Sequence, residues 1–490
     1  MFAGCHGRLV RPCKMRFVRD TGSELPAVPG TLLRSVGPLL ALILFASLAR
    51  AQDLTVHAPP QSGPIAIVGA TIHPVSGGDI DSGYIVFDKG RITDIGSGKH
   101  RFARGTEVID ATGLHVYPGL IGAVTRIGLT EISAVRAMRD YDEVGAITPE
   151  VRAAVAVNPD STLIPVARTA GILTVGVFPT GGVIPGRASV IRMDGWTWED
   201  MTIRDSAGLV LNWPNVRPIT AWWMRKSEEE QRKDIRRSLD RIDDAFDSAQ
   251  AYDAARAADP DLPIDLRWEA MHAVFPASPP SSGGAGIPPA SSSSPSSSQL
   301  PIFINANDVD QITAAVSWAI KRGLKPVIVG GRDAPLAADL LKRHDVPVII
   351  SGTHNMPKRS DSDYDQPFRL PATLESLGIR WCLASGQEAA HERNLRHNAG
   401  TAVAFGLSPE AAIRSITLAP ARILGIAGDL GSLETGKSAT LIITDGSPLE
   451  ITTRVRRAFI DGRDIDLSNK QTRLRDKYRL KYRQLDRADN

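Results

Sequence analysis

The sequence predicts an α/β protein in which a distorted (β/α)8 TIM-type barrel is joined to a small β-sandwich built from both ends of the mature chain. Three observations support this prediction. Residues 64–115 alternate short β-rich runs with turns, and a matching β-rich stretch follows near the C-terminus. Between them, apolar β-branched strands alternate with helices, a pattern typical of a parallel sheet covered by helices.

The first residues have the features of an export signal. Residues 1–34 are basic, residues 36–48 are apolar, and residues 49–51 (Ala-Arg-Ala) supply a small-residue cleavage site. The apolar run is shorter than the roughly 20 residues that a membrane-spanning helix needs. We therefore expect residues 1–51 to be a signal peptide, the mature protein to be periplasmic or extracellular, and no stable membrane anchor to remain. The alternatives are translation from Met15 and a buried N-terminal helix.

Removal of this segment changes the charge balance. It contains seven Lys or Arg residues and two acidic residues, so the formal net charge falls from +3 to −2. A nearly neutral chain gives no reason to expect nucleic acid or an anionic membrane as a partner. Cys382 is then the only cysteine, which excludes an intramolecular disulfide, and its apolar neighbours predict a buried, inert thiol.

Short strands at the two ends of the mature chain predict the sandwich. Its N-terminal half is expected at residues 64–115 and its C-terminal half at residues 425–466. Residues 88–91 (Asp-Lys-Gly-Arg) predict a hairpin turn in the first half. Residues 467–490 are highly charged and are expected to form an exposed helical tail. The predicted strands are residues 64–68, 84–87, 439–444 and 455–460.

Residues 116–424 are predicted to form the barrel. Its second half alternates regularly, whereas the first half is less regular and includes a long helix at residues 228–258, whose charges indicate a solvated face. Residues 277–300 are rich in Ser and Pro and contain too little apolar surface to fold, so we expect a disordered insert. The predicted strands are residues 172–178, 189–193, 301–305, 325–329, 346–351 and 379–385, with helices at 309–322 and 335–344.

A recognisable frame stands at the start of the barrel. Residues 118–121 are Pro-Gly-Leu-Ile, and they are followed by Gly122, Val124 and Arg126. This frame resembles the first barrel strand of the amidohydrolase superfamily, in which a P-G-L-I-D-x-H-x-H run places two histidines on a divalent metal. In this chain glycine stands at the aspartate position, and valine and arginine stand at the two histidine positions.

Motifs toward the C-terminus resemble the same superfamily, in particular its imidazolonepropionase-like secreted members. The resemblance extends over residues 64–465. Residues 408–410 (Ser-Pro-Glu) are typical of a helix start. Gly425 and Gly431 suit the turns where the chain leaves the barrel. These residues indicate fold rather than chemistry. The other matching runs are residues 383–387, 394–396, 398–400, 406–412, 418–421, 423–425 and 431–439.

The resemblance implies metal-dependent hydrolysis of non-peptide C–N bonds, often in cyclic amides, with zinc or another divalent ion activating water. It also implies metal ligands from the fifth, sixth and eighth strands. This chain has Asn305 at the fifth, Gly330 or Gly331 at the sixth and Gln387 at the eighth. The amide of Gln387 cannot accept the proton that an aspartate takes, and neither valine nor arginine binds a metal. We therefore expect no metal, no other cofactor and no catalytic residue.

The resulting hypothesis is a non-catalytic superfamily member that keeps the fold for binding or assembly. A retained pocket is expected to be lined by Arg126, Asn305, Arg332, Gln387 and His391. Two guanidinium groups without a metal favour a small anion such as a carboxylate over a neutral lactam.

Two alternatives stay open. The first is an active hydrolase, either metal-free or with a metal site rebuilt from His354, Asp361 and His391. The second is a structural protein that docks through residues 277–300 or through its charged tail. A homo-oligomer is also compatible with the sequence.

Overall fold

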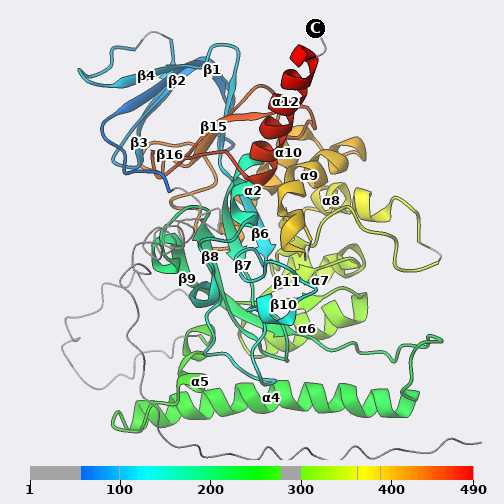
Figure 1. Ribbon diagram of the computed structural model, residues 1–490. Coiled ribbons are helices and arrows are strands. Elements are labelled where there is room, and N and C mark those ends of the chain that lie inside the picture. The colour runs from blue at the N-terminus through cyan, green and yellow to red at the C-terminus, as the bar shows by residue number, and fades with distance from the viewer. Residues whose placement is uncertain (1–56, 99, 277–298, 361, 387, 489–490) are drawn as a thin grey trace, which may run out of the picture. The chain divides into compact units, whose positions relative to one another are not determined.

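Two eight-stranded sheets form the framework of the protein (Figure 1). The computed structural model describes residues 57–98, 100–276, 299–360, 362–386 and 388–488. All of them belong to one structural unit, Thr55–Asn490. The predicted signal peptide, most of the predicted insert, Asp361 and Gln387 lie outside the described residues.

The first sheet is built from both ends of the chain, which confirms the predicted composite architecture. Its order is β16-β15-β14-β5-β1-β2-β3, with β4 parallel to β1. The two ends of the chain meet where β14 pairs antiparallel with β5. The strands are β1 (Ile65–Ile72), β2 (Ile80–Asp88), β3 (Arg91–Ser97), β4 (Glu107–Asp110), β5 (His115–Pro118), β14 (Leu441–Thr444), β15 (Val455–Ile460) and β16 (Arg463–Asp464).

This sheet curls so that distant strands enclose an apolar core. Phe87 of β2 packs edge-on against Phe459 of β15, with ring centroids 5.1 Å apart, although three strands lie between β2 and β15 in the sheet. The predicted hairpin turn joins β2 to β3, and its residues Lys89 and Gly90 have φ angles of 48° and 77°. Positive φ at both central positions suits a tight hairpin with the twist of the flanking strands.

The second sheet is a nearly closed barrel in the order β13-β12-β11-β10-β9-β8-β7-β6. Neighbouring strands from β9 to β13 are parallel, whereas β8 is antiparallel to both β7 and β9. This antiparallel strand is the distortion in the less regular half of the barrel. The strands are β6 (Leu120–Thr125), β7 (Ile172–Val177), β8 (Gly186–Arg192), β9 (Thr202–Asn212), β10 (Pro301–Ala306), β11 (Lys325–Gly330), β12 (Val348–Ile350) and β13 (Trp381–Leu383).

Helices cover the barrel, and one of them packs where its first and last strands meet. The short helix α11 contacts both β6 and β13, the terminal strands of the sheet. The α-helices are α2 (Leu163–Thr169), α3 (Trp198–Met201), α4 (Glu228–Ala258), α5 (Leu266–Glu269), α6 (Val309–Lys321), α7 (Ala338–Arg343), α8 (Gln366–Ser376), α9 (Leu395–Ala404), α10 (Pro409–Ser415), α11 (Leu418–Ile423) and α12 (Lys470–Ala488). The 3-10 turns are η1 (Arg136–Met138), η2 (Ala153–Ala156), η3 (His272–Val274), η4 (Ala334–Ala337) and η5 (Ala389–Asn394).

The long helix α4 is amphipathic only in its second half. It begins with a capping box, in which Ser227 and Glu230 exchange hydrogen bonds between side chain and backbone. Its buried residues lie between Ile242 and Tyr252, and Phe246 packs edge-on against Trp318 of α6, with ring centroids 4.9 Å apart. The charged first half faces solvent, as the charge pattern predicts.

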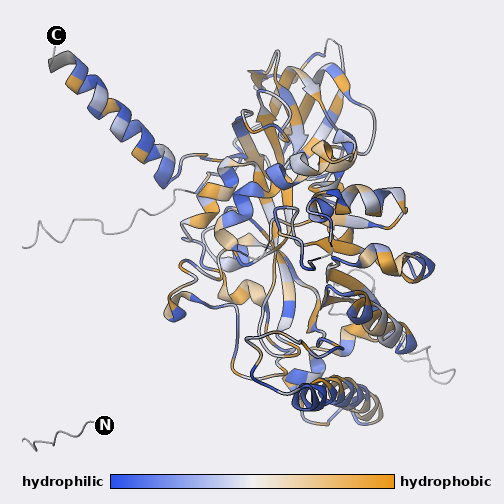
Figure 2. Cartoon of the chain, turned by 90° about the vertical axis from the view of Figure 1, so that its right-hand side faces the viewer, coloured by the Kyte–Doolittle hydropathy of each residue, from blue (hydrophilic) through white to orange (hydrophobic). Residues whose placement is uncertain are grey.

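The C-terminal helix α12 carries mostly hydrophilic side chains (Figure 2). Its start is fixed by Asn469, which accepts from the backbone N–H of Thr472 at 2.9 Å and donates to the hydroxyl of Thr169 at 2.8 Å. Among the residues that the structure describes, no helix is both long and apolar enough to cross a membrane.

Candidate ligand site at the strand ends

A cavity of about 270 Å³ lies at the carboxyl ends of the barrel strands. This is the end at which barrels of this type place their ligand sites. Segments that are far apart in the sequence meet there, because parallel strands bring their ends to one rim. The lining residues are Val124, Thr125, Arg126, Phe178, Pro179, Thr180, Gly181, Val210, Asn212, Asn305, Asn307, Val329, Gly330, Ser351, Ala384 and Gly386. We call this cavity the central pocket.

The structure therefore brings together the positions that the sequence frame singles out. Val124 and Arg126 reach the central pocket from β6 and the residue after it, Asn305 from β10 and Gly330 from β11. Gly386 reaches it from the segment after β13, next to Gln387, which lies outside the described residues. These positions share one cavity although up to 262 residues separate them in the sequence.

The sixth-strand position is Gly330 rather than Gly331. A side chain on Gly330 would meet Asn307, with a Cβ atom only 2.5 Å from Oδ1, and the φ angle of Gly330 is +106°. A Cβ on Gly331 would instead overlap Val348, away from the cavity. Both the backbone conformation and the neighbouring amide disfavour a histidine at the sixth-strand position.

Amide groups satisfy one another at the fifth-strand position. The side-chain N–H of Asn305 donates to Oδ1 of Asn212 at 2.6 Å. Asn212 in turn donates to the carbonyl oxygens of Gly181 and Gly182 at 3.0 and 3.1 Å. The sequence analysis missed Asn212. The signal in the sequence was its place directly after the apolar residues 209–211, at the end of a strand.

Arg126 supplies the positive charge of the central pocket. Its guanidinium lies over the ring of Tyr141, 4.7 Å from the ring centroid. Stacking on an aromatic face holds a guanidinium in place. The side chain is half-buried, so an anion bound to it would be partly shielded from water.

Arg332 does not line the central pocket. Its guanidinium forms an ion pair with Asp308, and Nε lies 3.4 Å from Oδ1 of the buried Asp333. Arg359 also pairs with Asp333. The positive charge of Arg332 is therefore compensated outside the cavity, because the loops after β10 and β11 place acidic residues beside it.

His391 lines a neighbouring cavity of about 300 Å³. This cavity shares Ser351 and Gly386 with the central pocket. His354 also lines it, and its Nε2 lies 2.8 Å from the hydroxyl of Thr401. Burial lowers the pKa of His354, which favours a neutral ring. His354 and His391 thus share a cavity, whereas Asp361 lies outside the described residues.

A divalent metal does not fit the described side chains of the central pocket. They offer amides, hydroxyls and one guanidinium, but no carboxylate, imidazole or thiolate. Among the described parts of the chain, no three His, Cys, Asp or Glu residues gather in a way that could hold a metal ion. The donor chemistry thus differs from the ligand set that the sequence frame implies.

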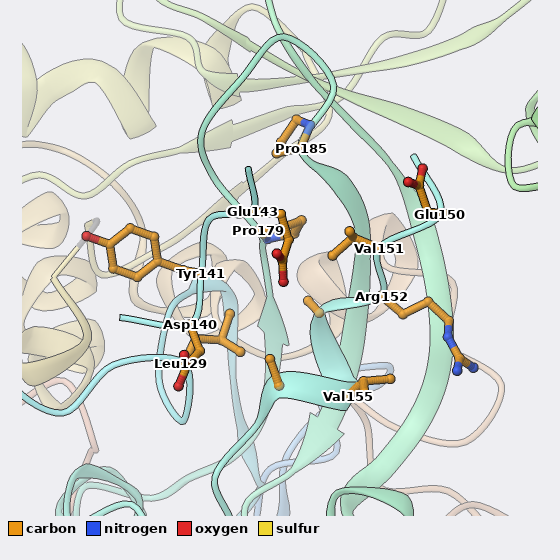
Figure 3. A pocket seen from close by; sticks show the side chains of 12 residues that line it. Leu129, Asp140, Tyr141, Glu143, Glu150, Val151, Arg152, Val155, Pro179 and Pro185 are labelled. Carbon is orange, nitrogen blue, oxygen red and sulfur yellow. The ribbon is translucent and has the colours of Figure 1, made fainter. Parts of the chain in front are cut away.

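A third cavity, of about 320 Å³, adjoins the central pocket. Tyr141 and Pro179 line it, and Tyr141 is the residue that stacks on Arg126. Figure 3 shows the carboxylate of Glu143 among the lining side chains, with the side chain of Arg152 pointing away from it. Arg152 forms an ion pair with Asp205 at 2.9 Å. The acidic character of this cavity is opposite to that of the central pocket.

A buried carboxyl stands beside the central pocket. Glu392 of η5 is fully buried, and its Oε2 accepts a hydrogen bond from the hydroxyl of Ser385 at 2.6 Å. Burial raises the pKa of Glu392 to about 7, while hydrogen bonds from Ser385 and Thr125 act in the opposite direction. The sequence analysis missed this residue. The available signal was Gly122, since a glycine inside a strand often marks close approach by another group.

Comparison with known proteins supports the same fold. Residues 313–467 match the model of the amidohydrolase family. Amidohydrolase tasK of Hapsidospora irregularis is 23% identical over 387 residues, which cover 72% of this chain and 37% of that protein. The chain thus spans little more than a third of the length of this relative.

Solved structures show the same architecture. An amidohydrolase from Thermotoga maritima MSB8 superposes with a TM-score of 0.68 at 22% sequence identity, covering 82% of this chain and 99% of the other. Molinate hydrolase superposes with a TM-score of 0.51 at 14% identity, covering 83% and 95% of the two chains. The matched C-terminal segment is thus similar to the amidohydrolase family, and the barrel and the composite sheet are the fold of the solved amidohydrolase structure.

Proposed function

We propose that this chain is a non-catalytic member of the superfamily that binds a small anion, such as a carboxylate, in the central pocket. The observation that supports this proposal is the position of Arg126. It stands where the sequence frame has a metal-binding histidine, and its guanidinium lies at the same cavity. A fixed cation in this place repels a metal ion and attracts an anion.

The rest of the central pocket suits such a ligand. The amides of Asn305 and Asn307 and the hydroxyls of Thr180 and Ser351 line the cavity and can donate hydrogen bonds. A volume of about 270 Å³ accommodates a small molecule. Guanidinium groups bind carboxylates with paired, charge-assisted hydrogen bonds, which gives both affinity and orientation.

Calorimetric titration with acetate, succinate and benzoate tests the proposal. We expect at least one of them to bind, with an affinity that falls as ionic strength rises because the interaction is electrostatic. Elemental analysis of protein purified without chelator is the companion measurement. Stoichiometric zinc, iron or manganese in the purified protein would overturn the non-catalytic proposal.

The alternative of an active hydrolase is tested with cyclic amide substrates. The protein is incubated with hydantoin and dihydrouracil, with and without added zinc, and the ring-opened products are measured. We expect no turnover above that of heat-denatured protein. Turnover that survives chelation would indicate a metal-free mechanism, and turnover that needs zinc would indicate a rebuilt metal site.

We also propose that the protein is exported. The support is the order of basic, apolar and small residues over positions 1–51. Expression of the full chain in a bacterial host, followed by N-terminal sequencing of the periplasmic fraction, tests it. A mature protein beginning at Gln52 is expected, and retention of the uncleaved chain in the cytoplasm would contradict the proposal.

A further inference from the structure

Position 122 has no room for a side chain because Glu392 fills the space. A Cβ atom built on Gly122 would overlap Oε1 of Glu392 and would lie 2.9 Å from its Cδ. The methyl group Cγ1 of Val175 stands on another side, at 3.1 Å. The carboxyl group of Glu392 therefore occupies the place toward which a side chain at position 122 would point.

The two oxygens of this carboxyl have different surroundings. Oε2 accepts from Ser385, and Thr125 forms a second side-chain hydrogen bond with the group. Oε1 has no hydrogen-bond partner among the described residues and faces Gly122. A buried carboxylate with a bare oxygen is costly, whereas a neutral carboxyl can leave one oxygen less satisfied.

Among the residues that the structure describes, no charged group compensates Glu392. Burial raises its pKa, the hydrogen bonds from two hydroxyl groups lower it, and no neighbouring charge contributes. Helix α2 packs on η5 and carries Arg168, but that guanidinium binds Asp194 at 2.7 Å. On η5 itself, Arg393 donates to the carbonyl oxygen of Ala390, and His391 lines the neighbouring cavity.

The hydroxyl partners connect Glu392 to the central pocket. Thr125 is the last residue of β6, directly before Arg126, and it lines the central pocket itself. Ser385 follows β13 and lies between two further lining residues, Ala384 and Gly386. The carboxyl thus joins the ends of β6 and β13, the two terminal strands of the barrel sheet.

We propose that Glu392 is a positioning residue of the central pocket: its carboxyl replaces the acidic side chain missing at position 122 and holds the strand end that carries Arg126. The sequence frame places an aspartate at position 122, on β6. In this chain a carboxyl reaches the same space from η5 instead. Gly122 and Glu392 are then a compensating pair, in which the carboxyl of Glu392 leaves no room for an aspartate at position 122.

A rescue experiment tests this pairing. The variants are Gly122→Asp, Glu392→Ala and the double variant Gly122→Asp with Glu392→Ala, compared by thermal unfolding. Each single change is expected to lower the melting temperature by several degrees, the first by overlap and the second by leaving a cavity. The double variant is expected to recover most of the loss. Additive losses, or a double variant less stable than either single variant, would overturn the proposal.

The conservative variant Glu392→Gln separates positioning from simple space filling. It keeps the volume and the hydrogen bonding but cannot ionise. We expect it to melt like the wild type at pH 5 and to lose the pH dependence of the wild type up to pH 8. A loss of stability at pH 5 as large as that of Glu392→Ala would show that the hydrogen bonds kept by glutamine do not hold the strand end and would overturn the proposal.

Acetate titration of Glu392→Ala adds a binding measurement, which rests on the proposed anion site. We expect affinity for acetate to fall at least threefold, because Arg126 is less well held. If the wild type binds no carboxylate, the proposed function fails, while the stability measurements still decide the role of Glu392. Unchanged affinity in a well-folded Glu392→Ala protein would overturn the positioning role.

Discussion

Asn305 donates a hydrogen bond to Asn212 across 2.6 Å and so joins the ends of β10 and β9 at the wall of the central pocket. Asn212 in turn donates to two carbonyl oxygens, so both of its side-chain N–H groups have protein partners. Asn305 stands at the position where the family resemblance implies a metal ligand. In this protein its side chain is part of the hydrogen-bonded wall of the central pocket. The central pocket therefore has a preformed polar lining around the single guanidinium of Arg126.

Replacement of Arg126 by Gln is expected to weaken carboxylate binding roughly 10- to 100-fold, since charge-assisted hydrogen bonds contribute about 1.5–3 kcal/mol. Calorimetric titration with the best-binding carboxylate measures the effect. Arg332→Gln is the matched control, because Arg332 pairs with Asp308 and does not line the central pocket. Equal losses in the two variants would contradict the assignment of the anion site to Arg126.

The titration of Glu392 predicts a definite pH dependence of stability. Its pKa is about 7 in the folded protein, against 4.5 for an unperturbed group. The folded chain therefore binds more protons between these values, and the free energy of unfolding falls as pH rises from 4.5 to 7. The loss is on the order of 3 kcal/mol. Urea unfolding of wild type and Glu392→Gln at several pH values measures it. A wild type that gains stability relative to the variant over this range would contradict the prediction.

A buried ion cluster around Asp194 is expected to dominate stability outside the pocket. Asp194 binds Arg168 at 2.7 Å, Arg463 at 2.8 Å and His57 at 3.2 Å. Asp194→Asn leaves the buried guanidinium of Arg168 uncompensated, so we expect a loss of about 3–5 kcal/mol in the free energy of unfolding.

Chemical denaturation of Asp194→Asn alongside Asp429→Asn provides the control for this cluster. Asp429 pairs with Arg91 at the surface, where both side chains are more than half exposed. An exposed pair contributes at most about 1 kcal/mol. If the two variants lost the same stability, burial would not be the cause.

The thiol of Cys382 is expected to be unreactive in the folded protein. It is fully buried in β13, and burial raises its pKa far above the usual range for a thiol. Only the thiolate reacts readily with disulfide reagents. The mature protein should therefore react with Ellman's reagent only after unfolding in guanidinium chloride. Complete reaction within seconds in native buffer would show that this strand is accessible.

The regular parts of the fold could be predicted because local patterns determine them. The helix predicted at residues 228–258 is observed with the same bounds, and β10 and β11 differ from the predicted strands by one residue at one end. The antiparallel direction of β8 could not be predicted, because strand direction depends on partners rather than on the pattern of the strand itself.

The candidate site shows the same limit. Val124, Arg126 and Asn305 were identified from their places in motifs, and the structure puts them in one cavity. Arg332 was predicted to line the pocket, but it forms an ion pair with Asp308 instead. No local sequence pattern indicates that these two residues are in contact.

The sequence by itself determined the resemblance to the superfamily, the composite sheet and the substitutions at the frame positions, because these properties follow from residue types and their order. Only the tertiary structure showed that Glu392 fills the space beside Gly122. These two residues are 270 positions apart. Their contact depends on how η5 packs against β6, and no local pattern encodes it. The glycine at position 122 is thus explained by the carboxyl of Glu392, which occupies the space where a side chain at that position would lie.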